Sequence, residues 1–113
     1  MPVVCNEAFG DVFFGVESDG AETCTIQNTK AVLPEGIFSA MAEMLLVNAD
    51  IKFETATSQY AFRFTRAAKE CTVGLADKSK GGEEWISGSW EDSIEFWEML
   101  EELAEQSEEV VTE

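Results

Sequence analysis

Few side chains in this sequence have the types and spacing that enzyme chemistry requires. The 113-residue chain contains no histidine, which is the commonest general base near neutral pH and the commonest metal ligand in proteins. Its three cysteines, Cys5, Cys24 and Cys71, form no Cys-x-x-Cys pair, whereas a structural zinc site without histidine would need four well-placed thiolates or carboxylates. We therefore predict that the protein binds no cofactor and no structural metal.

The glycines and acids do not spell a phosphate-binding or calcium-binding loop. Gly81-Gly82 is followed by Glu83-Glu84, whose negative charges would repel a phosphate group. No segment has the spaced Asp/Asn, Gly and Glu of a calcium loop. Carboxylates are abundant, but glutamate at nearly every outward position of a helix is typical of a solvated face. We predict a protein that is not an enzyme and has no catalytic residue.

Net charge is the property that departs most from an ordinary small domain. The chain has 23 acidic and 7 basic residues and a formal net charge of −16, whereas solubility alone accounts for about −2 to −8. Residues 1–29 and 81–113 contain acids and no base, while all seven bases lie within residues 30–80. Adaptation to high salt would spread the acids more evenly. The segregation therefore favours a function for the acidic ends.

Length and composition predict one folded domain in a reducing compartment. Hydrophobic residues make up 45% of the chain, including eight Phe and three Trp, which is enough for one core. An odd number of irregularly spaced cysteines argues against a disulfide framework. The sequence has neither an apolar run of the roughly 18–20 residues that cross a membrane nor a signal-peptide pattern after Met1. We expect a cytoplasmic protein, within a bacterial host cell if it is phage-encoded.

Local patterns predict an α+β fold with the element order β-β-α-β-β-β-α. Asp19-Gly20 forms the turn of a first hairpin, because both residues tolerate the left-handed backbone of tight turns. Pro34 belongs in the first turn of a helix, where its missing N–H is not needed. We expect one antiparallel sheet of about five strands with both helices packed on one face. The segments with strand-like alternation are residues 12–16, 22–27, 51–55, 60–65 and 71–75, and Trp85 begins a shorter one.

The last helix is predicted by its cap and by its periodicity. Ser89 can cap its N-terminus, and Asp92 stands at the third helical position. We expect the single domain to span residues 1–106 and the acidic residues 107–113 to form a frayed C-terminal tail. The apolar stripe of this helix consists of Trp90, Ile94, Trp97 and Leu100.

Acids of this helix and of the N-terminal hairpin are the candidate partner-binding residues. Glu–Lys pairs four residues apart stabilise a helix by about 0.2–0.5 kcal/mol, and like-charged pairs cost a similar amount. Glu98–Glu102 and Glu101–Glu105 are like-charged pairs at this spacing, which suggests that the repulsion serves docking on a basic surface. The candidates are Asp11, Glu17, Asp19, Glu91, Asp92, Glu95, Glu98, Glu101, Glu102 and Glu105.

A second constellation could bind single-stranded nucleic acid through the central sheet. Bases interleaved with aromatic residues on strands can contact phosphates and stack on nucleobases. Strand alternation weakens this alternative, because it directs Phe62 and Phe64 away from Arg63. The candidate nucleic-acid-binding residues are Lys52, Arg63, Arg66, Lys69, Lys78 and Lys80.

These features favour an acidic binding protein that inhibits or neutralises a basic partner. The first setting is a phage-type anti-defence protein, such as an anti-CRISPR or nucleic-acid mimic. The second is an immunity protein or antitoxin that masks a basic toxin. A small acidic secretion chaperone, typically a homodimer, is a further alternative. It would be favoured if Trp85, Trp90 and Trp97 formed one exposed patch.

Overall fold

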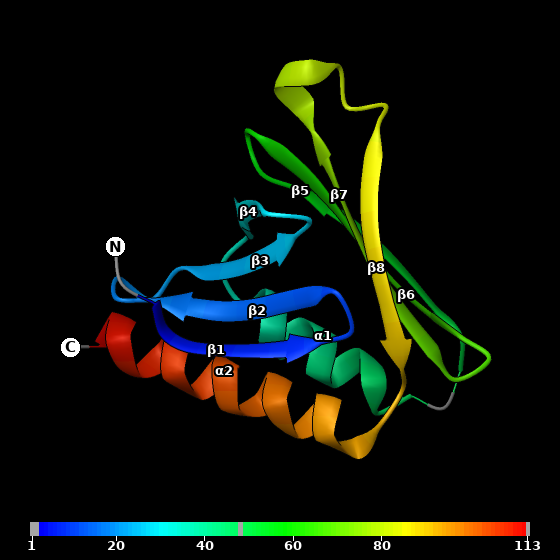
Figure 1. The fold of residues 1–113 in the computed structure, drawn as a ribbon. Helices are drawn as coiled ribbons and strands as arrows, with labels where there is room; N and C mark the ends of the chain where they lie inside the picture. The colour runs from blue at the N-terminus through cyan, green and yellow to red at the C-terminus, as the bar shows by residue number, and fades with distance from the viewer. Residues whose placement is uncertain (1–2, 48, 113) are drawn as a thin grey trace.

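The computed structural model describes residues 3–47 and 49–112, so Met1, Pro2, Asn48 and Glu113 lie outside it. Two four-stranded antiparallel sheets, with strand orders β1-β2-β3-β4 and β5-β6-β7-β8, combine with two α-helices and one short 3-10 turn (Figure 1). The elements are β1 (Val3–Phe9), β2 (Val12–Glu17), β3 (Glu22–Ile26), β4 (Thr29–Val32), α1 (Ile37–Leu45), β5 (Ile51–Ala56), β6 (Tyr60–Ala67), β7 (Glu70–Asp77), η1 (Lys78–Lys80), β8 (Trp85–Glu91) and α2 (Ile94–Thr112).

Both halves of the chain have the same order of elements, four consecutive antiparallel strands followed by a helix. Each half contains a two-residue hairpin turn with positive φ at both positions, Gln27-Asn28 in the first half and Ala68-Lys69 in the second. This left-handed conformation matches the right-handed twist of the paired strands. Each sheet is therefore built from local hairpins.

The α+β class, the antiparallel pairing and the two helices are confirmed, but the expected single sheet of about five strands is wrong. The sequence patterns missed β1 and β4. β1 has no regular alternation of apolar and polar residues, and β4 has only four residues. Their strand conformation comes from pairing with β2 and β3, in which Phe9 lies opposite Val12 and Thr29 opposite Ile26. The helix α1 then separates the two sheets along the chain.

The predicted start of the last helix is also wrong. Ser89 and Trp90 belong to β8, where Trp90 lies opposite Cys71 of β7. α2 begins at Ile94, which is 64% exposed, and the Oγ of Ser93 accepts a hydrogen bond from the backbone N–H of Phe96 at 3.3 Å. Trp90 fits both a helical and a strand period. Pairing with β7 decides for the strand, because it buries the indole in the core.

The remaining helix boundaries follow from backbone geometry. The expected place of Pro34 in the first turn of a helix is wrong. α1 begins at Ile37, with Gly36 at the N-cap in a left-handed conformation (φ 81°), and Pro34 belongs to a turn before the helix, where its carbonyl accepts the N–H of Ile37 at 3.2 Å. α2 continues to Thr112, and its Ser107 is buried, with the hydroxyl donating to the carbonyl of Gly20 at 2.6 Å. The division of the domain at residue 106 stays a prediction.

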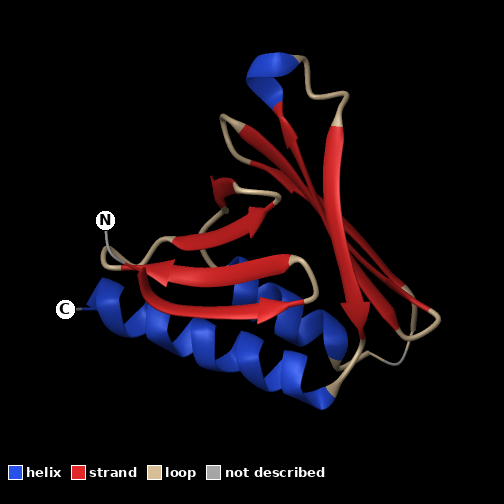
Figure 2. Ribbon diagram, in the orientation of Figure 1, coloured by secondary structure: helices blue, strands red, loops and turns tan. Residues whose placement is uncertain are grey.

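The two helices and the two sheets enclose one core. Figure 1 shows α2 alongside β1 and β2 with α1 beside it, and Figure 2 shows the second sheet standing across the end of the first. Phe96 of α2 lies where these parts meet. Its ring centroid is 4.7–6.2 Å from those of Phe9, Phe14, Phe64 and Trp90, which come from both sheets. This cluster fixes which face of α2 is buried.

The hairpin between β1 and β2 abuts the backbone of β8. A Cβ atom on Gly88 would lie 2.4 Å from Cγ2 of Val12, and one on Gly10 would lie 2.3 Å from the carbonyl oxygen of Ser89. Gly10 also has φ +58°. Glycine at these two positions lets the two sheets approach closely.

We predict that Gly88→Ala lowers the free energy of unfolding by about 1–3 kcal/mol, because the added methyl group overlaps the buried Val12 side chain. Chemical denaturation measures the change. Ser87→Ala is the matched control, since Ser87 is exposed on the same strand, and should change stability by less than about 0.5 kcal/mol. Equal stability of the two variants would contradict the close approach of the sheets.

Candidate functional site

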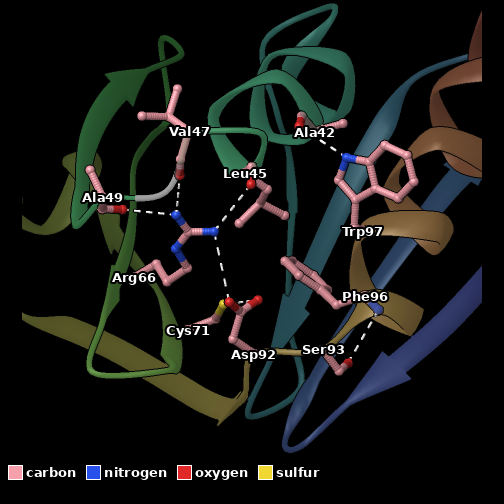
Figure 3. Close-up of polar contacts among 10 residues, drawn as sticks. All are labelled: Ala42, Leu45, Val47, Ala49, Arg66, Cys71, Asp92, Ser93, Phe96 and Trp97. Atoms are coloured by element: carbon pink, nitrogen blue, oxygen red, sulfur yellow. Dashed lines mark hydrogen bonds and ion pairs between the residues drawn. The ribbon is translucent and has the colours of Figure 1, made fainter.

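The helices α1 and α2 form an antiparallel pair that carries the acidic surface. The indole Nε1–H of Trp97, near the start of α2, donates to the carbonyl of Ala42 near the end of α1 at 3.2 Å (Figure 3). At the other end of the pair, Gly36, which precedes α1, lies beside Ser107 of α2. Neither helix contains a lysine or an arginine. Glu43 is the only charged residue of α1, and the seven glutamates of α2 supply most of the negative charge of the pair.

The glutamates of α2 form two rows on the exposed side of the helix. The groove row faces α1, and the outer row lies on the other flank. Both rows are exposed, and no ion pair between described residues involves Glu95, Glu98, Glu101, Glu102 or Glu105. The groove row consists of Glu101, Glu105 and Glu108, and the outer row of Glu95, Glu98, Glu102 and Glu109.

A groove of about 250 Å³ runs between the two helices. Its floor combines the apolar parts of Ala42, Leu46, Trp97 and Ala104. Glu43 lines the groove from α1, opposite the groove row of α2. The groove therefore combines apolar side chains with carboxylates from both helices.

The structure does not gather all ten predicted partner-binding acids on this surface. The five on α2 lie together, whereas Asp11 and Asp19 are exposed in the turns at the two ends of β2, and Glu91 is exposed at the end of β8. Glu17 is 5% exposed and forms an ion pair with Lys30. Asp92 lies in a half-buried junction. Glu17 and Asp92 are therefore occupied inside the protein, and the docking surface does not depend on them.

Arg66 of β6 is the centre of the junction that contains Asp92. Its guanidinium donates to the carbonyls of Leu45, at 3.3 Å, and of Val47 and Ala49, the last at 2.8 Å (Figure 3). It also lies 3.7 Å from the carboxylate of Asp92. The last carbonyls of a helix have no partner within the helix, so Arg66 caps the C-terminal end of α1. This predicted nucleic-acid-binding residue is thus engaged in holding α1 in place.

Cys24 and Cys71 are buried free cysteines. Cys71 donates its thiol to the carboxylate of Asp92, with the sulfur 3.6 Å from the oxygen. Burial, with the Asp92 charge next, raises the pKa of Cys71 to about 12, and burial raises the pKa of Cys24 to about 12 as well. Both thiols are therefore protonated near neutral pH and lack the thiolate that nucleophilic attack and metal binding require.

The other predicted nucleic-acid-binding bases do not converge on stacked aromatics. The guanidinium of Arg63 lies 2.7 Å from Glu54 and 4.0 Å from the ring centroid of Trp85. Lys78 donates to the carbonyl of Thr57 at 3.0 Å. Phe62 and Phe64 are buried on the opposite face of the sheet from Arg63. The other three candidate bases are exposed and lie on different elements: Lys52 on β5, Lys69 in the β6–β7 turn and Lys80 in η1.

Sequence reasoning missed Glu22, which organises the other end of α1. Its Oε1 accepts the backbone N–H of Phe38 at 2.9 Å, and the nearby backbone N–H groups of Gly36 and Ile37 also favour its charged form. A carboxylate is favourable at a helix N-terminus because the free N–H groups point towards it. Burial raises the pKa of Glu22 despite these bonds. The sequence pattern that could have identified it is the alternation of β3, which places Glu22 on the same face as the buried Cys24 and Ile26.

The described residues contain no ready-made metal centre and no long apolar helix. Within residues 3–47 and 49–112, no three His, Cys, Asp or Glu side chains are grouped so that they could hold a metal ion. In the same part of the chain, no helix combines the length and the apolar character needed to cross a membrane.

We predict that Arg66→Met lowers the free energy of unfolding by about 2–4 kcal/mol, because three carbonyls and Asp92 lose their partner. Amide exchange should quicken most at the end of α1. The control is Arg63→Met, which removes a half-exposed ion pair and should cost less than about 1 kcal/mol. A loss at Arg66 no larger than at Arg63 would show that the cap contributes nothing.

The raised pKa of Glu22 predicts a pH dependence of stability. A carboxyl group whose pKa is raised by folding holds its proton more tightly in the folded state. Its contribution is complete below the unfolded pKa of about 4.3 and is lost as the pH rises through the folded pKa. The stability of the wild type relative to Glu22→Gln should therefore fall from pH 4 towards pH 7 in chemical denaturation. A constant difference would refute this assignment.

Comparison of the sequence with protein-family models and with curated proteins found no match.

Proposed function

We propose that this protein is a non-catalytic binding protein whose acidic helix layer docks on a basic surface of a partner protein and blocks it. The acidic helix layer is the exposed side of α1 and α2, including both glutamate rows. The observation that carries the proposal is that these helices expose acids on both sides of an apolar groove and contain no lysine or arginine. A basic partner would relieve the repulsion between neighbouring glutamates.

The charge spacing of α2 supports a partner that normally binds nucleic acid. Seven glutamates lie between Glu95 and Glu109, a length of roughly 21 Å at the rise of an α-helix. The helix therefore carries one negative charge per roughly 3 Å, close to the roughly 3.4 Å per phosphate along one strand of duplex DNA. A basic protein groove that normally binds one phosphate strand would therefore meet a similar spacing of negative charges on α2.

This similarity favours the anti-defence setting, in which a phage protein acts in the cytoplasm of a bacterial host. The protein would occupy the nucleic-acid site of a defence nuclease or CRISPR complex as a nucleic-acid mimic. An immunity protein or antitoxin that masks a basic nuclease toxin would use the same surface. The identity of the captured partner distinguishes the two settings.

The alternatives gain no support from the placement of their residues. The three tryptophans do not form the exposed patch expected of a secretion chaperone. Trp90 is 8% exposed in the core, Trp97 packs between the helices, and Trp85 lies over Gly74 on the second sheet. For single-strand binding, the bases are dispersed and Phe62 is buried. We therefore favour the acidic helix layer over both.

We predict that reversing three charges of the outer row, Glu95→Lys with Glu98→Lys and Glu102→Lys, slows partner association at least about tenfold without unfolding the protein. Long-range attraction sets association rates, and all three side chains are exposed. Affinity capture from bacterial lysate identifies the partner, and surface plasmon resonance then measures its association rate. Circular dichroism checks the fold.

A nucleic-acid-binding partner should be released from the wild type by short duplex DNA. The control is Ser87→Ala, an exposed change on β8, outside both helices, that leaves the net charge intact. An association rate that is unchanged by the triple charge reversal would contradict the proposal.

A further inference from the structure

We infer that the groove between α1 and α2 seats an arginine from a basic segment of the partner, stacked on Trp97 between Glu43 and Glu101. This inference rests on the proposed function and deepens it. It divides the acidic helix layer into two parts. The groove row holds the partner, and the outer row attracts it.

The groove has the chemistry to bind a cation with an apolar stem. Trp97 is half-buried, and its hydrogen bond to the carbonyl of Ala42 fixes the orientation of the indole. Glu43 lies on one wall and Glu101 and Glu105 on the other. A side chain bound between the two helices would be partly shielded from water, so its ion pairs at the walls would be stronger than those on an open helix face.

The floor favours arginine over lysine. A guanidinium is planar, stacks on aromatic rings and pairs with carboxylates through two parallel hydrogen bonds. The protein contains such an arrangement on its second sheet. There the guanidinium of Arg63 lies 4.0 Å from the ring centroid of Trp85 and 2.7 Å from the carboxylate of Glu54. The groove offers the tryptophan and the carboxylates of this arrangement without the arginine.

The groove is small, which suits one side chain of a protein partner. Its volume of about 250 Å³ is below the roughly 300–1,000 Å³ of pockets that enclose small ligands. Leu46 lines the groove and is 70% exposed, so an apolar surface continues beyond the walls. A peptide segment that places one arginine in the groove would also cover Leu46.

The outer row lacks these features. Glu95, Glu98 and Glu102 are exposed on the flank of α2 that does not line the groove. None of the three lines the groove with Trp97 and Glu43. The two rows therefore provide matched sets for a test, because neutralising three acids in either place changes the net charge by the same amount.

The test compares two triple variants with fluorescein-labelled nona-arginine as the probe. The groove variant is Glu43→Gln with Glu101→Gln and Glu105→Gln, and the outer variant is Glu95→Gln with Glu98→Gln and Glu102→Gln. Fluorescence anisotropy at low salt measures both dissociation constants. We expect the groove variant to weaken binding about tenfold and the outer variant only about twofold to threefold, since it loses long-range attraction alone.

Each outcome has a distinct meaning. Equal weakening by the two variants would overturn the groove inference and leave the acidic-surface proposal intact. Failure of the wild type to bind nona-arginine at low salt would contradict the acidic-surface proposal itself. Circular dichroism and thermal melts confirm that the variants are folded, which is expected because every altered side chain is exposed.

A second measurement isolates the stacking contact. The wild type should bind nona-arginine several-fold more tightly than nona-lysine. Trp97→Leu keeps an apolar floor but removes the aromatic ring, so this preference should fall to about one. A preference for arginine that persists in a folded Trp97→Leu protein would show that Trp97 does not contact the guanidinium.

Discussion

The packing of aromatic rings around Phe96 is the interaction on which the rest of the structure depends. Phe96 is fully buried and contacts rings from β1, β2, β6 and β8, so one side chain of α2 touches both sheets. Aromatic pairs contribute about 0.5–1.5 kcal/mol each beyond the burial of their area. Because this cluster holds one face of α2 inward, the glutamates on the opposite face must point to solvent.

A buried carboxyl group, that of Glu22, and a half-buried guanidinium, that of Arg66, then fix α1 beside α2. α1 has only nine residues, too few for a helix to be stable by itself in water. Glu22 binds the free N–H groups at its beginning, and Arg66 binds the carbonyls at its end. The groove exists because both ends of α1 are held by strands, one in each sheet. The position of Glu43 opposite the groove row follows from these contacts.

Acidic and basic residues lie on different parts of the molecule. Both helices contain acids and no base, whereas Lys52, Arg63 and Lys69 belong to the second sheet or its turns. The core face of α2 offsets the repulsion between its neighbouring glutamates, which a solitary helix would not tolerate as readily. A positively charged partner would therefore approach the helix layer, and the groove would decide which of its side chains is held.

Features that depend on local periodicity and composition were predictable from the sequence alone. The exposed acidic face of α2, the Asp19-Gly20 turn and the alternation of β5 and β6 were all predictable, because side chains repeat every 3.6 or 2 residues. Only the tertiary structure decided that β1 and β4 form, that the strands divide into two sheets and that Trp90 lies in β8.

Tertiary contacts also decided which acids pair with a base and which line the groove between the helices. Glu17 pairs with Lys30 across the first sheet, and α1 divides the glutamates of α2 into a groove row and an outer row. Such outcomes depend on contacts between distant residues, such as the hydrogen bond from Ser107 to Gly20. Local propensity carries no information about these contacts, because their energy appears only when the remote segments meet.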